Sequence, residues 1–136
     1  MRLLARVLAL LAALSLVAQP AAAQSILRDA ETEALLDDMA AAEGWNPGLH
    51  DGDALFGLDP EGFLMGWLGD GPVASVSCVR YSEHYAFLGF YIVDPLLRGH
   101  GLGKAIWGAS LDHARGCVVG LDGVVTQQHN YRRAGF

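Results

Sequence analysis

Residues 93–105 read VDPLLRGHGLGKA, where an apolar run ends at a proline and three glycines lead into a segment with helical periodicity. Glycines allow a backbone to approach a ligand closely, and the N–H groups at a helix start converge on an anion. Arg98 adds a bidentate fork for phosphate oxygens, and His100 and Lys104 are further candidates. The stretch therefore predicts a diphosphate site, with a tight turn that has only a structural role as the alternative.

Two other phosphate signatures do not fit the same glycines. A Walker loop that ends at Gly103-Lys104 would begin at Arg98 instead of Gly, and Ala105 would take the place of its Ser or Thr. A dinucleotide fingerprint fails because its third glycine would fall on Lys104 or Ile106. Asp122 lies at a suitable distance for a ribose contact, but it loses that meaning once the glycines fail.

The segments around this turn predict an α+β fold around a mixed sheet. Residues 85–93 form a continuous apolar run that indicates a strand covered on both faces. Residues 62–68 and 73–79 predict a hairpin through Gly-Asp-Gly-Pro. The remaining expected elements are strands at 25–30 and 117–121 and helices at 31–43, 51–58, 101–115 and 127–134.

The first 23 residues resemble a secretory signal. Arg2 and Arg6 precede an apolar run at 7–18, and small residues at 21–23 suit cleavage before Gln24. The apolar run is short for a membrane span, so no stable span is expected. We therefore divide the chain into a signal-like leader at 1–23 and one domain at 24–136. The alternatives for the leader are a start codon placed too far upstream or a helix that packs on the domain.

The charge balance is acidic, with a formal net charge of −6 over 136 residues. This balance argues against nucleic acid and anionic membranes as partners, and it suits an amine-bearing small molecule. Cys78 and Cys117 are too few and too far apart for a zinc site, and each lies in apolar sequence typical of a buried thiol. No metal is expected.

The glycine stretch resembles motif A of the Gcn5-related N-acetyltransferases (GNAT), V-x-P-x-x-R/Q-G-x-G-x-G/A, at every fixed position. A second match follows at the end of the chain, where YRRAGF at 131–136 is similar to the Y-x-x-x-G-F of motif B. The segments AAEGWNPG at 41–48 and LDGVV at 121–125 further resemble a bacterial branch of the family that has an additional C-terminal half.

The resemblance implies a mixed, mostly antiparallel sheet flanked by helices, with acetyl-CoA as co-substrate and a small-molecule or peptide amine as acceptor. An N–H of Ile92 or Val93 would stabilise the oxyanion, and Tyr131 matches the position of the general acid. Trp45 and Asn46 belong to the loop that usually contacts the acceptor. The residues implied to bind the cofactor are Ile92, Val93, Arg98, Gly99, His100, Gly101, Leu102, Gly103 and Lys104.

No motif marks the general base. Glu83 is the candidate we name, and His84 and Asp94 also flank the central strand. Each of the three is equally compatible with a solvated surface position.

The sequence departs from the family pattern at both ends. It stops at Gly-Phe, where the family continues into further strands, so we expect an uncovered strand at 117–121 and self-association or marginal stability. A cleaved leader would also remove the protein from cytoplasmic acetyl-CoA. A cytoplasmic N-acetyltransferase is therefore the preferred function, and an exported or truncated GNAT-like domain without acetyl transfer is the alternative.

Overall fold

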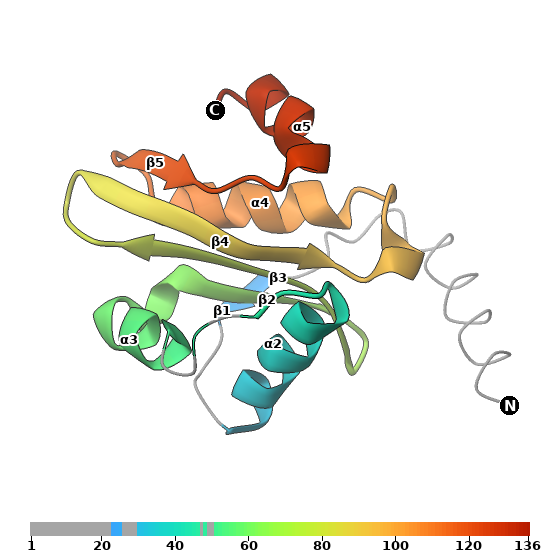
Figure 1. Cartoon of the computed structure of the whole chain (residues 1–136). Coiled ribbons are helices and arrows are strands. Elements are labelled where there is room, and N and C mark those ends of the chain that lie inside the picture. Colours follow the sequence, from blue (N-terminus) through green and yellow to red (C-terminus); the bar gives the residue numbers. More distant parts are fainter. Residues whose placement is uncertain (1–22, 26–29, 47, 49–50) are drawn as a thin grey trace, which may run out of the picture.

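The computed structural model describes residues 23–25, 30–46, 48 and 51–136. Figure 1 shows a central sheet with helices on both of its faces. The strands are β1 (Ala23–Ser25), β2 (Phe63–Leu68), β3 (Gly71–Arg80), β4 (Tyr85–Val93) and β5 (Val118–Leu121). The helices are α2 (Ala30–Ala42), α3 (Asp51–Leu58), α4 (Leu102–His113) and α5 (Gln128–Arg133), with short 3₁₀ turns at Pro60–Gly62, Pro95–Leu97 and Val125–Gln127.

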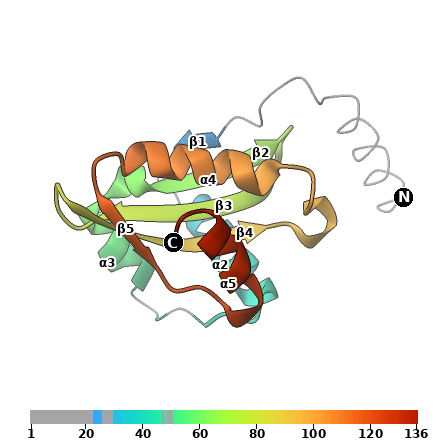
Figure 2. The same ribbon diagram turned by 90° about the horizontal axis from the view of Figure 1, so that it is seen from above.

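The five strands lie in the order in which they occur in the chain. β1 to β4 are antiparallel neighbours, and β5 pairs with β4 in parallel. A parallel pair needs a crossover connection. The connection from β4 to β5 is made by α4, which runs across one face of the sheet (Figure 2). The predicted mixed and mostly antiparallel sheet, with helices on both faces, is confirmed.

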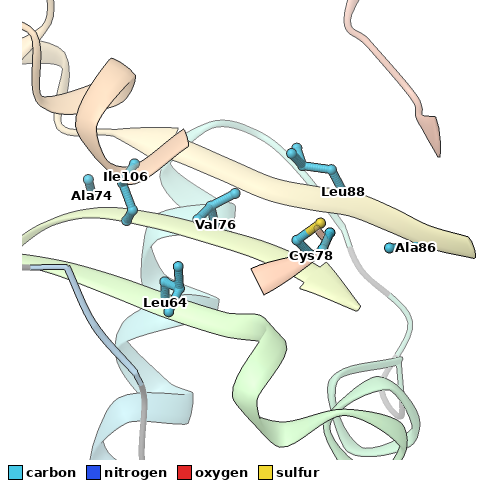
Figure 3. Packing of buried hydrophobic residues seen from close by; sticks show 8 residues of the cluster. Leu64, Ala74, Val76, Cys78, Ala86, Leu88 and Ile106 are labelled. Atoms are coloured by element: carbon cyan, nitrogen blue, oxygen red, sulfur yellow. The ribbon is translucent and has the colours of Figure 1, made fainter. Parts of the chain in front are cut away.

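One core forms between the sheet and α4. Alternate residues of β3 point to this face, which is why Ala74, Val76 and Cys78 are all buried there. Ile106 of α4 packs over them (Figure 3). The other buried members of this cluster are Leu64, Ala86, Leu88 and Ala114.

A second core covers the opposite face of the sheet. Phe63, Met65 and Val79 are buried there because they alternate with the residues that face α4. Leu35, Leu36 and Met39 of α2 and Leu55 and Phe56 of α3 pack against them. The helices α2 and α3 therefore cover this face, and the space between them and β4 is where the larger cavity described below lies.

A polar link joins the two faces near the start of β2. The Asp59 carboxylate accepts from the backbone N–H of Arg80 and lies against Nε2 of His113, both at 2.8 Å. The side chains of Asp59 and His113 are only 13% and 19% exposed. A hydrogen-bonded carboxylate at this depth fixes the end of β3 to the last turn of α4.

The expected elements at 31–43, 51–58, 85–93, 101–115, 117–121 and 127–134 are present within one or two residues of their expected bounds, as is the 62–79 hairpin. The strand expected at 25–30 overlaps β1 (Ala23–Ser25) at Ser25, and Ala30 already belongs to α2. Residues 26–29 and most of the signal-like leader lie outside the described residues. The expected cleavage point before Gln24 falls inside β1, which pairs with β2.

Candidate active site

A bulge interrupts β4 near its middle. Ser75 pairs with Ile92 and Ser77 pairs with Gly89, so Val76 alone opposes two residues of β4. At the bulge Phe90 has a φ of 48°, which is rare for a residue with a side chain. Its carbonyl accepts a hydrogen bond of 2.8 Å from the Ser75 hydroxyl. A buried serine thus supports a backbone conformation that costs energy.

The two parallel strands separate just before this bulge. β5 pairs with residues 85–88 of β4, and no described strand pairs with residues 89–93 on that side. The Asp94 N–H donates to Val73 O of β3. Because alternate amides of a strand point the same way, the Ile92 amide also faces β3 and the Val93 amide faces the open edge. Of the two amides proposed from the sequence, only that of Val93 faces this opening.

The glycine turn follows the open edge and ends at the first turn of α4. Gly99 and Gly101 have φ values of 82° and 85°, and a Cβ built on either would meet nothing within 4 Å. The first backbone hydrogen bond of the helix runs from the Ala105 N–H to the Gly101 carbonyl. The N–H groups of Leu102, Gly103 and Lys104 precede it, so helix geometry leaves them without partners inside α4. The turn is therefore an open cradle of backbone donors.

Arg98 links this turn to the end of α2. Its Nε donates to Val93 O at 2.9 Å, and its terminal nitrogen pairs with the Glu43 carboxylate. Half of the Arg98 side chain is exposed. His100 is exposed, and its Nδ1 lies 2.9 Å from Arg98 O. Lys104 is exposed.

Two cavities meet where β4 and β5 separate. The smaller, of about 170 Å³, lies between the strands and α5 and includes Tyr91 and Tyr131. The larger, of about 540 Å³, extends under β3 and β4 toward α3. Four residues line both cavities, namely Trp45, Gly89, Phe90 and Asp122. This shared wall includes the bulge itself, so two molecules bound in the two cavities would meet beside Phe90.

Tyr131 lies in the smaller cavity, held by aromatic contacts. Its ring stacks on Trp107 of α4 with centroids 5.7 Å apart, and Tyr91 and Phe136 contact the same indole edge-on. Burial raises the pKa of Tyr131. Burial also raises the pKa of Tyr91, and the nearby Tyr131 adds to this effect. The Tyr131 phenol therefore stays protonated at neutral pH, as a proton donor requires.

The structure does not bring Glu83 to this site. Glu83 and His84 are exposed in the loop between β3 and β4, at the opposite end of β4 from the glycine turn. Neither residue lines either cavity. Asp94 is closer to the turn, but its carboxylate caps the 95–97 turn through the Leu96 N–H at 2.9 Å.

Asp122 is the carboxylate that the structure places at the junction of the two cavities. In the sequence, Asp122 stands out only because its distance from the glycines suits a ribose contact in a dinucleotide pattern that the glycines themselves do not match. Its position directly after β5 was the available signal, since residues that follow a strand tend to lie at the functional edge of a sheet. Trp45, expected from its loop, does line both cavities.

A strand edge opened by a bulge thus lies beside a glycine turn that begins a helix. The chain belongs to the acetyltransferase (GNAT) family, whose model matches residues 22–136. Within the described part of the chain, no helix is long and apolar enough to cross a membrane, and no group of His, Cys, Asp and Glu is suited to a metal ion.

Individual relatives agree with this assignment. The chain is 43% identical over 102 residues to the holothin acyltransferase of Pseudoalteromonas sp. (strain SANK 73390), and the match covers 75% of this chain but 35% of that protein. Ard1 from Thermoplasma volcanium superposes with a TM-score of 0.72 at 19% identity, covering 85% and 81% of the two chains. A Mycobacterium tuberculosis protein solved in complex with CoA has a TM-score of 0.66 at 16% identity, covering 84% and 70%. At these identities the two structures establish the fold.

Proposed function

We propose that this chain transfers an acetyl group from acetyl-CoA to the nitrogen of an amine, in the cytoplasm. The observation that carries the proposal is the open edge of β4 at residues 89–93, which leads directly to the backbone donors at the start of α4. A thioester bound along this edge has its diphosphate at the turn and its acyl group near the bulge. Membership of the GNAT family and the acyltransferase relative support the same activity.

The residues present fit a diphosphate. Anion oxygens would accept from the N–H groups between Gly99 and Lys104, where the positive end of the α4 dipole adds to the attraction. The left-handed conformations of Gly99 and Gly101 keep side chains away from this space. Arg98 would supply the nearest fixed charge after partly exchanging Glu43 for phosphate oxygens.

The acyl group would lie beside the bulge, where one backbone amide and one side chain would serve the reaction. The Val93 amide, or that of another residue on the open edge, would donate to the carbonyl oxygen as negative charge develops there. Tyr131 would give its phenolic proton to the departing sulfur. Glu83 lies in the loop before β4, at the far end of that strand from the glycine turn, and is not placed to take the amine proton directly.

Isothermal titration of the 136-residue chain with acetyl-CoA and with CoA tests the proposal. Arg98→Ala combined with Gly101→Asp places a negative side chain in the cradle and removes the nearby cation, so binding should fall at least about 100-fold. Arg115→Ala is the matched control, because Arg115 pairs with Asp112 on an exposed part of the α4 end. Unchanged affinity in the double variant would reject the site.

Holothin, the acceptor named in the relative, is the first amine to test in a turnover assay. Release of the CoA thiol in the presence of holothin, and its loss in Tyr131→Phe, are the expected results. If CoA binds but no amine is ever acylated, the non-catalytic domain would replace the enzyme as the better description.

A further inference from the structure

The larger cavity has walls that are mainly aromatic and apolar. Trp45 from the loop after α2, Tyr81 from the loop after β3, and Phe87 and Phe90 from β4 contribute rings. Leu55 and Val79 add aliphatic surface. Aromatic walls of this kind bind flat apolar groups through offset stacking and edge contacts. The cavity volume of about 540 Å³ suits a small molecule of a few fused or linked rings.

The polar groups of this cavity are few. Asn46, Ser77 and Asp122 are its polar side chains besides the Tyr81 phenol, and none of the described lining residues is Lys, Arg or His. An acceptor that carries a phosphate or carboxylate would find no cation here among the described residues, and its charge would face Asp122. The described lining therefore selects against anionic acceptors.

Asp122 stands where an acceptor and an acyl donor would meet. It lines both cavities, together with Phe90 at the bulge, and Tyr131 lines the donor side of the same junction. Resting on the acetyl transfer proposed above, we infer that the acceptor is a neutral aryl or heteroaryl amine that binds between these rings, and that Asp122 takes its proton.

The protons and electrons of this step balance without a further reagent. The amine lone pair forms the C–N bond at the thioester carbonyl, and the C–S bond breaks to release the sulfur. Asp122 accepts the N–H proton as the nitrogen becomes acidic, directly or through one water, and Tyr131 protonates the sulfur. The products are an amide and the free thiol of CoA.

The nature of the base explains why an aryl amine is favoured over an alkyl amine. An alkyl amine is protonated at neutral pH, and a carboxylate is a much weaker base than such an amine. An aryl amine already has a free lone pair at neutral pH, so its nitrogen loses a proton only after attack has begun. The described lining contains carboxylate and phenol groups and no stronger base.

Two pairs of amines test the inference in a thiol-release assay with acetyl-CoA. 4-Methylaniline and benzylamine are isomers that differ in amine basicity, and 4-aminobenzamide and 4-aminobenzoate differ mainly in charge. We expect 4-methylaniline and 4-aminobenzamide to be preferred by at least about tenfold in kcat/KM. Equal or better use of benzylamine or 4-aminobenzoate would overturn the inference.

Variants then separate the role of Asp122 from packing. Asp122→Asn should lower kcat about 100-fold with 4-methylaniline while the affinity for CoA is unchanged. Phe87→Leu should raise KM about fivefold with little change in kcat. Asp112→Asn, on the exposed end of α4, is the matched control and should behave as wild type.

The failures of the two proposals differ in their signatures. A chain that does not bind CoA refutes the acetyl transfer and this inference with it. A chain that binds CoA and acylates benzylamine, but neither neutral aryl amine, refutes only the acceptor class. Full activity of Asp122→Asn refutes its role as the proton acceptor.

Discussion

Replacement of Gly103 by alanine is the sharpest test of how the turn packs against β4. A Cβ at Gly103 would lie 2.4 Å from the hydroxyl oxygen of Tyr91 and 3.2 Å from Cγ2 of Val93. The first distance is far below van der Waals contact, so the Tyr91 ring would have to move. That ring packs edge-on against Trp107, with centroids 5.0 Å apart, which limits its movement.

The expected cost follows from two opposing effects. Overpacking of this kind costs about 1–3 kcal/mol, whereas alanine in place of glycine stabilises a helix by up to about 1 kcal/mol. We expect Gly103→Ala to destabilise the protein by about 1–2 kcal/mol. In a Tyr91→Phe background the 2.4 Å contact is absent, and the nearest ring carbon of residue 91 is 3.4 Å away. There the same substitution should be close to neutral.

The wild type, the two single variants Gly103→Ala and Tyr91→Phe, and the double variant form a double-mutant cycle. Urea denaturation of these four proteins gives the coupling free energy between the two sites, which should be about 1–2 kcal/mol. Gly101→Ala is the control, because its cost of about 1–2 kcal/mol comes from the left-handed backbone and not from a neighbour. That cost should be the same with Tyr or Phe at position 91. An equal loss from Gly103→Ala in both backgrounds would refute the packing argument.

Three further predictions concern stability and association. Asp59→Ala should cost about 3 kcal/mol in urea denaturation because it leaves two partners unsatisfied, and His113→Ala about half as much; equal costs would contradict this account. Burial, with Cys117 and Asp59 nearby, raises the pKa of Cys78 from 9.0 to about 11. The contribution of this thiol to the free energy of unfolding should therefore be fully present below pH 9, and about 3 kcal/mol should be lost as pH rises through 11. Cys78→Ala should remove this alkaline loss, whereas Cys117→Ala should keep the larger part of it, because burial is the main cause of the shift. Val118 is 73% exposed on the edge strand β5, so the chain should self-associate in sedimentation experiments and Val118→Lys should reduce it; a monomeric parent chain would contradict the prediction.

Local patterns predicted most of the fold because they act over short stretches of chain. The apolar run at 85–93, the hairpin glycines at 69 and 71 and the glycine turn each determine their own backbone within about ten residues. The same locality made the turn recognisable as an anion site. Its open geometry at Gly99 and Gly101 agrees with that interpretation.

Contacts between distant residues were beyond such patterns. The bulge falls inside an apolar run whose letters give no sign of an extra residue at Phe90. The pairing of Arg98 with Glu43 and the position of Asp122 depend on how α2 and β5 dock on β4. Glu83 is a candidate base because it lies next to β4 in the sequence, but the nine residues of that strand separate it from the glycine turn.

The bulge also restricts how β4 can change during evolution. Before the bulge the even-numbered residues Ala86 and Leu88 face α4. After it the odd-numbered residues Tyr91 and Val93 do so, because the bulge adds one residue to the strand. Deletion of Phe90 would restore regular pairing, with Val76 opposite Tyr91, and Tyr91 and Val93 would still face α4. A deletion elsewhere in β4, with the bulge kept, would exchange the two faces of the strand. Changes of length are therefore tolerable at the bulge and not along the rest of β4.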